Sequence, residues 1–443
     1  DAETCKDVEV IGWLYQYFNQ EEKDRVIKAK KRYKGFEIPY ATQLFTPDWI
    51  VRYMTQNSLG KLWMEANPTS ALKNKMEFYL EPRNVSAEAK KELESHIFKG
   101  IKPQEIKVFD PACGSGHVLV YAFELLYDIY KEQGYPDNEI PEMILKNNLF
   151  GLDICDRAAQ LAQFAVMMKA RAYDRNIFNK VSEVNICSVK DTKWIKADVL
   201  EDLLEGVANK EYAKKQIFLT CECFNEARII GSLCKVDGID ISFWEERLEY
   251  FKNQKQTTMN TPAIRGRLPF LIKQIKIMQQ NYECVITNPP YMGGKYMEPI
   301  LAEFIQEEYK DVKSDLFSAF IVYCQTKTKD NGYIGFMTPF VWMFISSYED
   351  LRNKIINDTD ITSLVQLEYS GFDGATVPIC TFTLAKRNIE EMSGCYIRLS
   401  DFPGAKNQPI KTREAVLNKD CGFYFETKNT DFSSIPGSPI AYW

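Results

Sequence analysis

The chain is poor in histidine, with only two among its 443 residues. A site that depends on a histidine base is therefore disfavoured, because histidine is the commonest general base in enzymes. Long apolar runs are lacking as well. No segment approaches the roughly 20 consecutive apolar residues that a membrane-spanning helix needs, so the sequence predicts a protein without a membrane segment.

The twelve cysteines follow no disulfide spacing. In a chain of this length, scattered cysteines indicate reduced thiols and a cytoplasmic location. Cys221, Cys223 and Cys234 lie close together, but their spacing fits no zinc template, and His96 and His117 are far away, so no metal site is predicted. The net charge of −6 argues against a protein that binds nucleic acid over its whole surface, although a local basic face would be enough for such binding.

The length suggests two or three domains, at roughly 100–200 residues per domain. Residues 1–105 are interpreted as a helical N-terminal region, and residues 106–390 as an α/β domain. Turn signals multiply after residue 387, so residues 391–443 are interpreted as the start of a further, truncated region. Because the chain begins at Asp1 rather than at methionine and stops at Trp443, both ends are interpreted as cuts.

From residue 106, β-branched and aromatic runs alternate with amphipathic helical segments, which is typical of a mostly parallel sheet covered on both faces. Strands are expected over residues 106–110, 149–154, 284–287, 333–337, 363–367 and 379–384, and helices over residues 119–130, 157–172, 299–308 and 315–326. Residues 371–378 are too few for a crossover helix, so the last two strands should be antiparallel. Residues 175–282 should hold one more strand and inserted helices.

A glycine-rich loop follows the first expected strand: Phe109-Asp110-Pro111-Ala112-Cys113-Gly114-Ser115-Gly116. Glycines allow sharp turns and a close approach to a ligand at the carboxyl end of a strand. The loop lacks the Gly-x-Gly-x-x-Gly and Lys-Ser/Thr patterns of phosphate-binding loops, and it begins with a carboxylate that would repel a phosphate. Asp110 therefore favours a ligand with a cationic end.

A second carboxylate, Asp153, ends the next expected strand in Gly151-Leu152-Asp153. At the tip of that strand it can accept hydrogen bonds from both hydroxyls of a ribose. An acidic loop followed by such a carboxylate is the pattern expected for a nucleoside that carries an amino acid.

Asn288-Pro289-Pro290-Tyr291 follows the expected strand 284–287. The prolines make the turn rigid and remove backbone donors, which leaves the Asn288 side-chain oxygen and the Pro289 carbonyl as acceptors. Acceptors aimed at one point can hold a planar amine by its hydrogens and turn its lone pair toward an electrophile. Tyr291 offers an aromatic face on which a base can stack.

The motifs in this order resemble the amino-methyltransferases of DNA. In the adenine enzymes one segment closes over the methionine end of the cofactor, and Gln43-Leu44-Phe45-Thr46-Pro47 resembles it. This segment lies before the glycine-rich loop, and that order of motifs defines the γ group of these enzymes. Thr46-Pro47-Asp48 also predicts a helix start, with the Thr46 hydroxyl as the cap. The segments from Asp315 to Phe336 and from Gly371 to Phe382 resemble the family's later motifs, the second offering Phe372 to a flipped base.

The resemblance implies the class I methyltransferase fold, an α/β fold with a Rossmann-like, mostly parallel sheet and one antiparallel edge strand. It implies S-adenosylmethionine as cofactor, and transfer of its methyl group to the N6 amine of a flipped-out adenine in double-stranded DNA. The catalytic residues implied are Asn288, Pro289, Pro290, Tyr291 and Phe372. The cofactor-binding residues implied are Thr46, Pro47, Asp110, Ala112, Gly114, Gly116, Asp153, Ile154, Ser232, Asn288 and Asp315, with Ser232 proposed for the adenine contact.

Further stretches are similar to the adenine methyltransferases of BREX phage-defence systems. They start at Ile11, Thr46, Asp156 and Asn288, and the resemblance covers roughly residues 8–390. It implies self-marking of DNA in a phage-defence or restriction–modification system, with other defence proteins as candidate partners.

Two alternatives stay open. Protein glutamine N5-methyltransferases also use Asn-Pro-Pro-Tyr, but they are shorter and lack both the closing segment and the large insertion. A catalytically silent DNA-binding or specificity subunit could keep the fold, although the intact Asp110, Asp153 and Asn288 argue against it.

Overall fold

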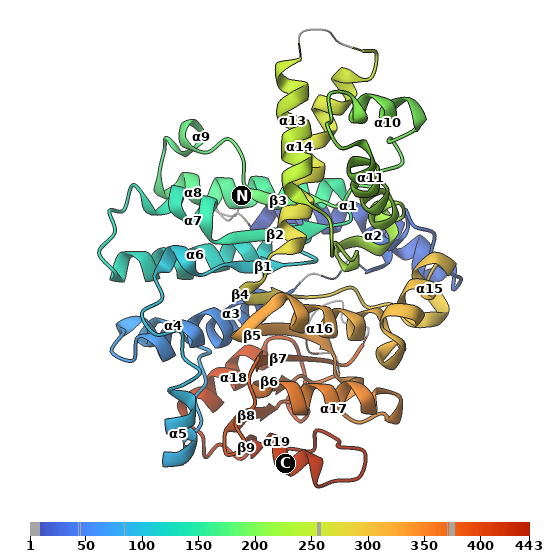
Figure 1. Cartoon of the computed structure of the whole chain (residues 1–443). Coiled ribbons are helices and arrows are strands. Elements are labelled where there is room, and N and C mark those ends of the chain that lie inside the picture. The colour runs from blue at the N-terminus through green and yellow to red at the C-terminus, as the bar shows by residue number, and fades with distance from the viewer. Residues whose placement is uncertain are drawn as a thin grey trace.

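The computed structural model describes residues 9–42, 44, 46–83, 85–254, 258–369, 371 and 377–443, with side chains from residue 17 onward. Its centre is a nine-stranded sheet with the order β3-β2-β1-β4-β5-β7-β6-β8-β9 (Figure 1). The strands are β1 (Val108–Asp110), β2 (Leu149–Asp153), β3 (Asn185–Ser188), β4 (Tyr282–Thr287), β5 (Thr328–Pro339), β6 (Asp360–Gln366), β7 (Ile379–Ala385), β8 (Ser393–Arg398) and β9 (Tyr424–Lys428).

The sheet is mostly parallel, as the alternation of strands and helices predicts. β3, β2, β1, β4 and β5 run in the same direction. β7 is antiparallel to β5 on one side and to β6 on the other, which confirms the reversed pair expected from the short 371–378 connection. β9 forms an antiparallel edge beside β8. The expected α/β class, with a mostly parallel sheet and an antiparallel edge, is therefore confirmed.

Helices precede the sheet, cover it and connect its strands. Those of the N-terminal half are α1 (Glu9–Lys28), α2 (Ile38–Thr42), α3 (Asp48–Thr55), α4 (Lys61–Ala66), α5 (Ala87–Leu93), α6 (His117–Glu132), α7 (Ile140–Asn147), α8 (Asp156–Tyr173), α9 (Ile177–Lys180), α10 (Ala197–Leu204) and α11 (Lys210–Phe224). The others are α12 (Ala227–Ile230), α13 (Ile241–Asn253), α14 (Thr261–Gln279), α15 (Pro299–Glu308), α16 (Leu316–Lys327), α17 (Glu349–Asp358), α18 (Asn407–Leu417) and α19 (Asn429–Ser433).

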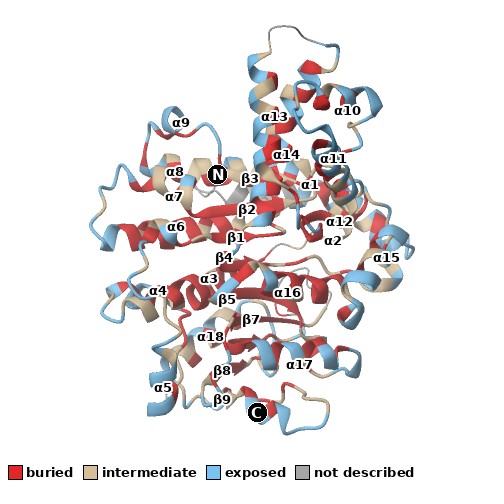
Figure 2. Ribbon diagram, viewed as in Figure 1, coloured by how far each residue is buried: buried red, intermediate tan, exposed pale blue. Residues whose placement is uncertain are grey.

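Buried apolar side chains line both faces of the sheet, because neighbouring residues of a strand point to opposite sides. Val108 belongs to a cluster with α3, α4, α6 and α8, whereas Phe109 belongs to a cluster with α11, α13, α14 and α16. Figure 2 shows the buried strands between helices whose outer faces are exposed. The carboxyl ends of the central strands are thereby held on a rigid platform.

The long connection between β2 and β4 contains the one further strand expected there, β3, which pairs with β2. The rest of this connection is mainly helical, and Figure 1 shows α10, α11, α13 and α14 gathered at the upper end of the molecule. Within the part of the chain that the structure describes, no helix is long and apolar enough to cross a membrane.

The helix expected after Thr46-Pro47 is present but begins differently from the prediction. α3 starts at Asp48 with Pro47 as its N-cap, and no side chain caps it. The expected capping by the Thr46 hydroxyl is therefore wrong, because that hydroxyl accepts a hydrogen bond from Asn288 instead. α3 continues through a buried π-helical turn, η2 (Gln56–Gly60), into α4.

The tail joins the same sheet. β8 pairs with β6 in parallel, and β9 pairs with β8. Arg387, just after β7, forms a buried ion pair with Glu65 at the end of α4, with Nη–Oε distances of 2.7 and 2.9 Å. This ion pair connects α4 to the end of β7.

Candidate functional site

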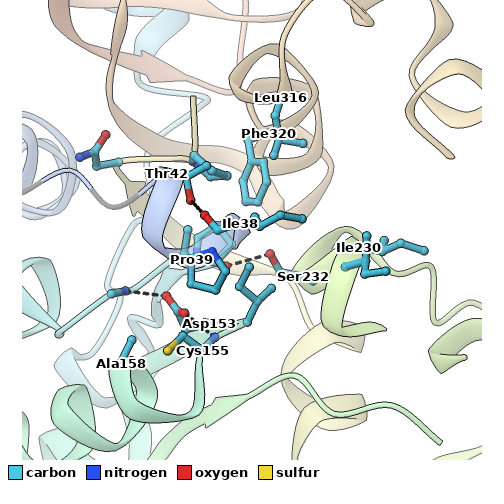
Figure 3. Close-up of a pocket in the computed structure, with 18 of the residues that line it drawn as sticks. Ile38, Pro39, Thr42, Asp153, Cys155, Ala158, Ile230, Ser232, Leu316 and Phe320 are labelled. Atoms are coloured by element: carbon cyan, nitrogen blue, oxygen red, sulfur yellow. Dashed lines mark hydrogen bonds between the residues drawn. The ribbon is translucent and has the colours of Figure 1, made fainter. Parts of the chain in front are cut away.

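A pocket opens at the carboxyl ends of β1, β2 and β4, the edge where open α/β sheets bind their ligands (Figure 3). Its empty volume, including the open mouth, is about 820 Å³. The polar residues that line it include Thr42, Asp153, Ser232 and Asn288. The apolar walls are formed by Ile38, Pro39, Leu44, Ile154, Ile229, Ile230, Leu301, Leu316 and Phe320.

The loop between β1 and α6 forms the floor of the pocket. Gly114 and Gly116 have φ angles of +51° and +88°, a backbone conformation that residues with side chains rarely adopt. A Cβ at Gly114 would stand in open space, whereas a Cβ at Gly116 would lie 2.8 Å from the Ala162 Cα of α8. Gly114 therefore keeps the floor open to a ligand, and Gly116 lets the loop pack against a helix.

Asp153 occupies the tip of β2 and lines the pocket. Its two carboxylate oxygens accept the backbone N–H groups of Gly114 at 2.9 Å and of Cys155 at 2.8 Å. Each oxygen keeps a further lone pair for a ligand. Burial raises the pKa of Asp153 to about 6, although these backbone hydrogen bonds oppose the shift.

Asp110 is buried behind the loop, and in the described residues it does not line the pocket. Its Oδ1 accepts the Thr287 hydroxyl at 2.7 Å and the Ala112 N–H at 3.1 Å. Burial raises the pKa of this carboxyl to about 7, and the charge of Asp153 adds to the shift. The hydrogen bond to Thr287 ties the end of β1 to the end of β4, directly before Asn288.

Asn288 follows β4 and is held from two sides. Its amide nitrogen donates to the Leu44 carbonyl at 3.2 Å and to the Thr46 hydroxyl at 3.0 Å. Its Oδ1 lies 2.6 Å from the Tyr291 hydroxyl, which also lies 2.9 Å from the Met337 carbonyl. Residues 44 and 46 therefore contact the amide that the sequence singles out for chemistry.

Two further predicted residues have internal partners. Ser232 is buried, and its hydroxyl donates to the Pro111 carbonyl at 2.8 Å while the residue lines the pocket. Asp315 caps α16, where its Oδ1 accepts the N–H groups of Met292 at 2.9 Å and Phe317 at 3.2 Å. Burial raises the pKa of Asp315 to about 6.

The structure places about half of the residues that the motifs single out in the lining of one pocket. Of these residues, the pocket lining contains Ala112, Gly114, Asp153, Ile154, Ser232, Asn288 and Pro290. The others that the structure describes are not part of this lining: Thr46, Pro47, Asp110, Gly116, Pro289, Tyr291 and Asp315. Phe372, together with Gln43 and Phe45 of the closing segment, lies outside the described residues.

Several wall residues were not predicted. Ile38 and Pro39 come from α2, far before the glycine loop, and Leu301, Leu316 and Phe320 come from α15 and α16. An apolar residue in a short helix resembles any core residue in a sequence. Only the segment that starts at Asp315 resembles a family motif, and this resemblance could have indicated Leu316 and Phe320 as wall residues.

The chain matches the profiles of two protein families. The profile of the Eco57I restriction-modification methylase family matches residues 147–372, about half of the chain, and the N-6 DNA methylase profile matches residues 62–199. The chain belongs to the Eco57I restriction-modification methylase family. Methyltransferases in general use S-adenosylmethionine as methyl donor, which is the class of ligand that the motifs indicate.

Two curated relatives match the whole chain. It is 38% identical to the adenine-specific methyltransferase BrxX of Escherichia coli O9:H4 (strain HS), covering 38% of that protein. It is 34% identical to the adenine-specific methyltransferase PglX of Lacticaseibacillus casei (strain Zhang), covering 37% of that protein. The resemblance expected from the motifs is thereby confirmed. The chain spans less than two fifths of the length of these relatives.

Among solved structures, the fold is similar to a nuclease-deletion mutant of the Type ISP restriction-modification enzyme LlaGI, in complex with a DNA substrate mimic. The TM-score is 0.50 at 14% identity, covering 88% of this chain and 27% of that one. This similarity concerns the fold alone.

Proposed function

We propose that this chain transfers the methyl group of S-adenosylmethionine to the exocyclic N6 amine of a flipped-out adenine in DNA. The observation that carries the proposal is that Asn288, the proposed amine acceptor, and Asp153, the proposed ribose acceptor, line one pocket. In this proposal residues 106–390 form the catalytic domain and residues 1–105 supply the segment that closes the site.

The pocket suits the cofactor in chemistry. Asp153 offers carboxylate lone pairs to ribose hydroxyls, and Gly114 leaves open space for close approach to the backbone. Ile154, Ile230 and Phe320 provide apolar walls for a nucleoside and a thioether chain. When bound, S-adenosylmethionine supplies a methyl group on a positively charged sulfur, which needs no further activation.

The protein's own contribution is to position the amine. The Asn288 oxygen and the Pro289 carbonyl accept the two hydrogens of the adenine amine, so its lone pair turns toward the pocket that holds the cofactor. Tyr291 and Phe372 are proposed to stack on the flipped base, which offsets the few kcal/mol that flipping costs. Positioning of this kind lowers a barrier by up to several kcal/mol. The amine nitrogen forms its bond to carbon as the sulfur–methyl bond breaks, and the methylated amine then loses its extra proton to water.

Double-stranded DNA is the proposed partner, as the resemblance to the adenine methyltransferases implies. That resemblance also supports a role in self-marking within a phage-defence or restriction–modification system, with other proteins of such a system as partners. The net charge of −6 does not exclude DNA binding, because a local basic face is enough for it.

The direct test is to incubate the chain with radiolabelled S-adenosylmethionine and unmethylated bacterial DNA and to identify the labelled product. We expect N6-methyladenine with the native chain and none with Asn288→Ala. Asn225→Ala, at the exposed end of α11, is the matched control and should retain the label. Calorimetry should detect S-adenosylmethionine binding in all three proteins.

Each other result identifies a different function. Label on protein in place of DNA would favour a protein methyltransferase. Cofactor binding without any transfer would favour a silent DNA-binding or specificity subunit. A chain that neither binds the cofactor nor transfers a methyl group would contradict the proposal.

A further inference from the structure

The Asn288 side chain is held by a segment that lies more than two hundred residues before it in the sequence. Its amide nitrogen donates one hydrogen to the Leu44 carbonyl, at 3.2 Å, and the other to the Thr46 hydroxyl, at 3.0 Å. An amide NH₂ has two hydrogens. Both donors of Asn288 are therefore occupied by the closing segment.

These contacts leave one orientation for the amide. The Leu44 carbonyl can only accept a hydrogen bond, so the atom facing it must be the amide nitrogen. If the amide were turned by 180°, Oδ1 would face that carbonyl at about 3.2 Å and two acceptors would repel each other. The Leu44 carbonyl thus directs the Asn288 oxygen toward the opposite side, and the hydrogen bond to Thr46 holds the amide nitrogen in that orientation.

Thr46 is a firm anchor for this arrangement. It is 7% exposed, and it precedes Pro47, which caps α3 with a φ of −55°. α3 is fixed in the core by Ile50 and by Tyr53, whose hydroxyl donates to Ser363 of β6 at 2.7 Å. The hydroxyl of Thr46 makes no capping bond to α3, so it is available to accept from Asn288.

The oxygen side of the amide keeps room for a substrate. The Tyr291 hydroxyl lies 2.6 Å from Asn288 Oδ1 and 2.9 Å from the Met337 carbonyl, but it has only one hydrogen to donate. Asn288 Oδ1 has two lone pairs, so it can accept from an amine in addition to the Tyr291 hydroxyl. The Asn288 amide can therefore accept a hydrogen bond from the substrate amine through Oδ1, while its nitrogen stays bonded to the Leu44 carbonyl and the Thr46 hydroxyl.

We propose that Thr46 is a positioning residue for methyl transfer: its hydroxyl, with the Leu44 carbonyl, locks the Asn288 amide so that its oxygen faces the amine. This inference rests on the proposed function and adds to it. Thr46 then acts on the amine acceptor rather than on cofactor affinity. The segment that closes the cofactor pocket also prepares the acceptor for the substrate.

The test separates a positioning role from a cofactor-binding role. Thr46→Val keeps the shape and removes the hydroxyl, whereas Thr46→Ser keeps the hydroxyl. At saturating S-adenosylmethionine and DNA, Thr46→Val should lower the single-turnover rate by about tenfold, the effect of one hydrogen bond. Thr46→Ser should restore the rate to within about threefold, and the Kd for S-adenosylmethionine should change by less than about threefold in both variants.

A matched control is Thr55→Val, which removes a buried threonine hydroxyl that donates within its own helix, to the Val51 carbonyl at 2.8 Å. It should not change the single-turnover rate. A raised Kd for S-adenosylmethionine with an unchanged saturated rate in Thr46→Val would overturn the positioning role and leave the proposed function standing.

A second readout needs no catalysis. Thermal midpoints are measured for Thr46→Val, Asn288→Ala and the double variant. If the two side chains are bonded, Thr46→Val lowers the midpoint by about 2 °C in the native chain and has no further effect beside Asn288→Ala. Additive midpoints would overturn the inference. If the native chain methylates no adenine, the proposed function fails separately, and these midpoints still decide whether Thr46 locks the amide.

Discussion

At Gly116 the loop after β1 passes against α8 without room for a side chain. Its φ is +88°, and a Cβ there would lie 2.8 Å from the Ala162 Cα. Gly134 has a similar φ of +81° but nothing within 4 Å of the added atom. Substitutions at the two positions therefore distinguish the cost of a left-handed backbone, present at both, from the cost of steric overlap, present only at Gly116.

We expect Gly134→Ala to lower the free energy of unfolding by about 1–2 kcal/mol, the cost of a left-handed alanine. Gly116→Ala should lose a further 1–3 kcal/mol or so, because the loop must move away from α8. It should also weaken S-adenosylmethionine binding, since Gly114 lies in the same loop. Urea unfolding and calorimetry measure the two effects, and equal losses for both variants would contradict this explanation.

Asp153 makes cofactor binding dependent on pH. Burial raises its pKa from 3.8 to about 6, and an ionised carboxylate is the better acceptor for ribose hydroxyls. The affinity for S-adenosylmethionine should therefore be full above about pH 7 and fall toward pH 5. The stability of the ligand-free protein depends on pH in the opposite direction. Because the carboxyl pKa is higher in the folded state than in the unfolded state, stability increases as pH falls from about 6 to about 4.

Calorimetric titrations between pH 5 and pH 8 test this dependence. Asp153→Asn should bind at least about tenfold more weakly at pH 8, the loss expected for a hydrogen bond to a charged group, and its pH dependence should be smaller. Asp156→Asn, which loses an ion pair with Lys190 nearby, should keep the native profile. A native affinity that is constant between pH 5 and pH 8 would contradict the assignment of Asp153 as the acceptor for the ribose hydroxyls.

At the scale of elements, a buried ion pair joins the N-terminal helices to the far strands of the sheet. The Arg387 guanidinium binds both oxygens of Glu65 at the end of α4, and it lies 3.6 Å from Asp360 of β6. Its side chain is only 2% exposed. This contact holds the helical run α3–η2–α4, and with it Thr46, against the sheet.

Removal of one partner from a buried ion pair leaves an uncompensated charge. Arg387→Met should therefore lower the free energy of unfolding by about 3–5 kcal/mol, measured by urea denaturation. Lys354→Met breaks an exposed pair with Asp358 on α17 and should leave the midpoint almost unchanged. Comparable losses in the two variants would show that Arg387 contributes no more than a surface charge.

At the scale of the whole molecule, the site is assembled from distant parts of one chain. Ile38 and Leu44 come from the N-terminal region, Asp153 from β2, Ser232 from the insertion and Phe320 from α16. None of these segments forms the pocket alone. A ligand in the pocket should therefore stabilise all of them together.

Hydrogen exchange followed by mass spectrometry tests this expectation. Addition of S-adenosylmethionine should slow exchange in peptides from residues 38–50, 111–116, 153–156 and 229–233, since binding opposes local opening. Peptides from β9 and α19, on the far edge of the sheet, serve as the control and should not change. Protection confined to residues 111–116 would contradict an assembled site.

The local elements of the fold were predictable because their signals are local. Alternating apolar runs located β1, β2, β4, β5, β6 and β7, and the short 371–378 connection indicated the reversed pair. The glycine loop and Asn-Pro-Pro-Tyr were recognisable because backbone geometry restricts those positions to few residue types. β8 and β9 escaped prediction, since turn residues surround both strands and their place in the sheet depends on the pairing of β8 with β6.

The sequence by itself determined the order of motifs, the family resemblance and the identity of the acceptor residues, because covalent order and residue chemistry need no folding. The tertiary structure decided which partners these side chains take. Asp110 binds Thr287, and Thr46 binds Asn288 rather than its own helix. Such choices depend on which groups lie within about 3 Å after packing, and packing brings together residues that are hundreds of positions apart.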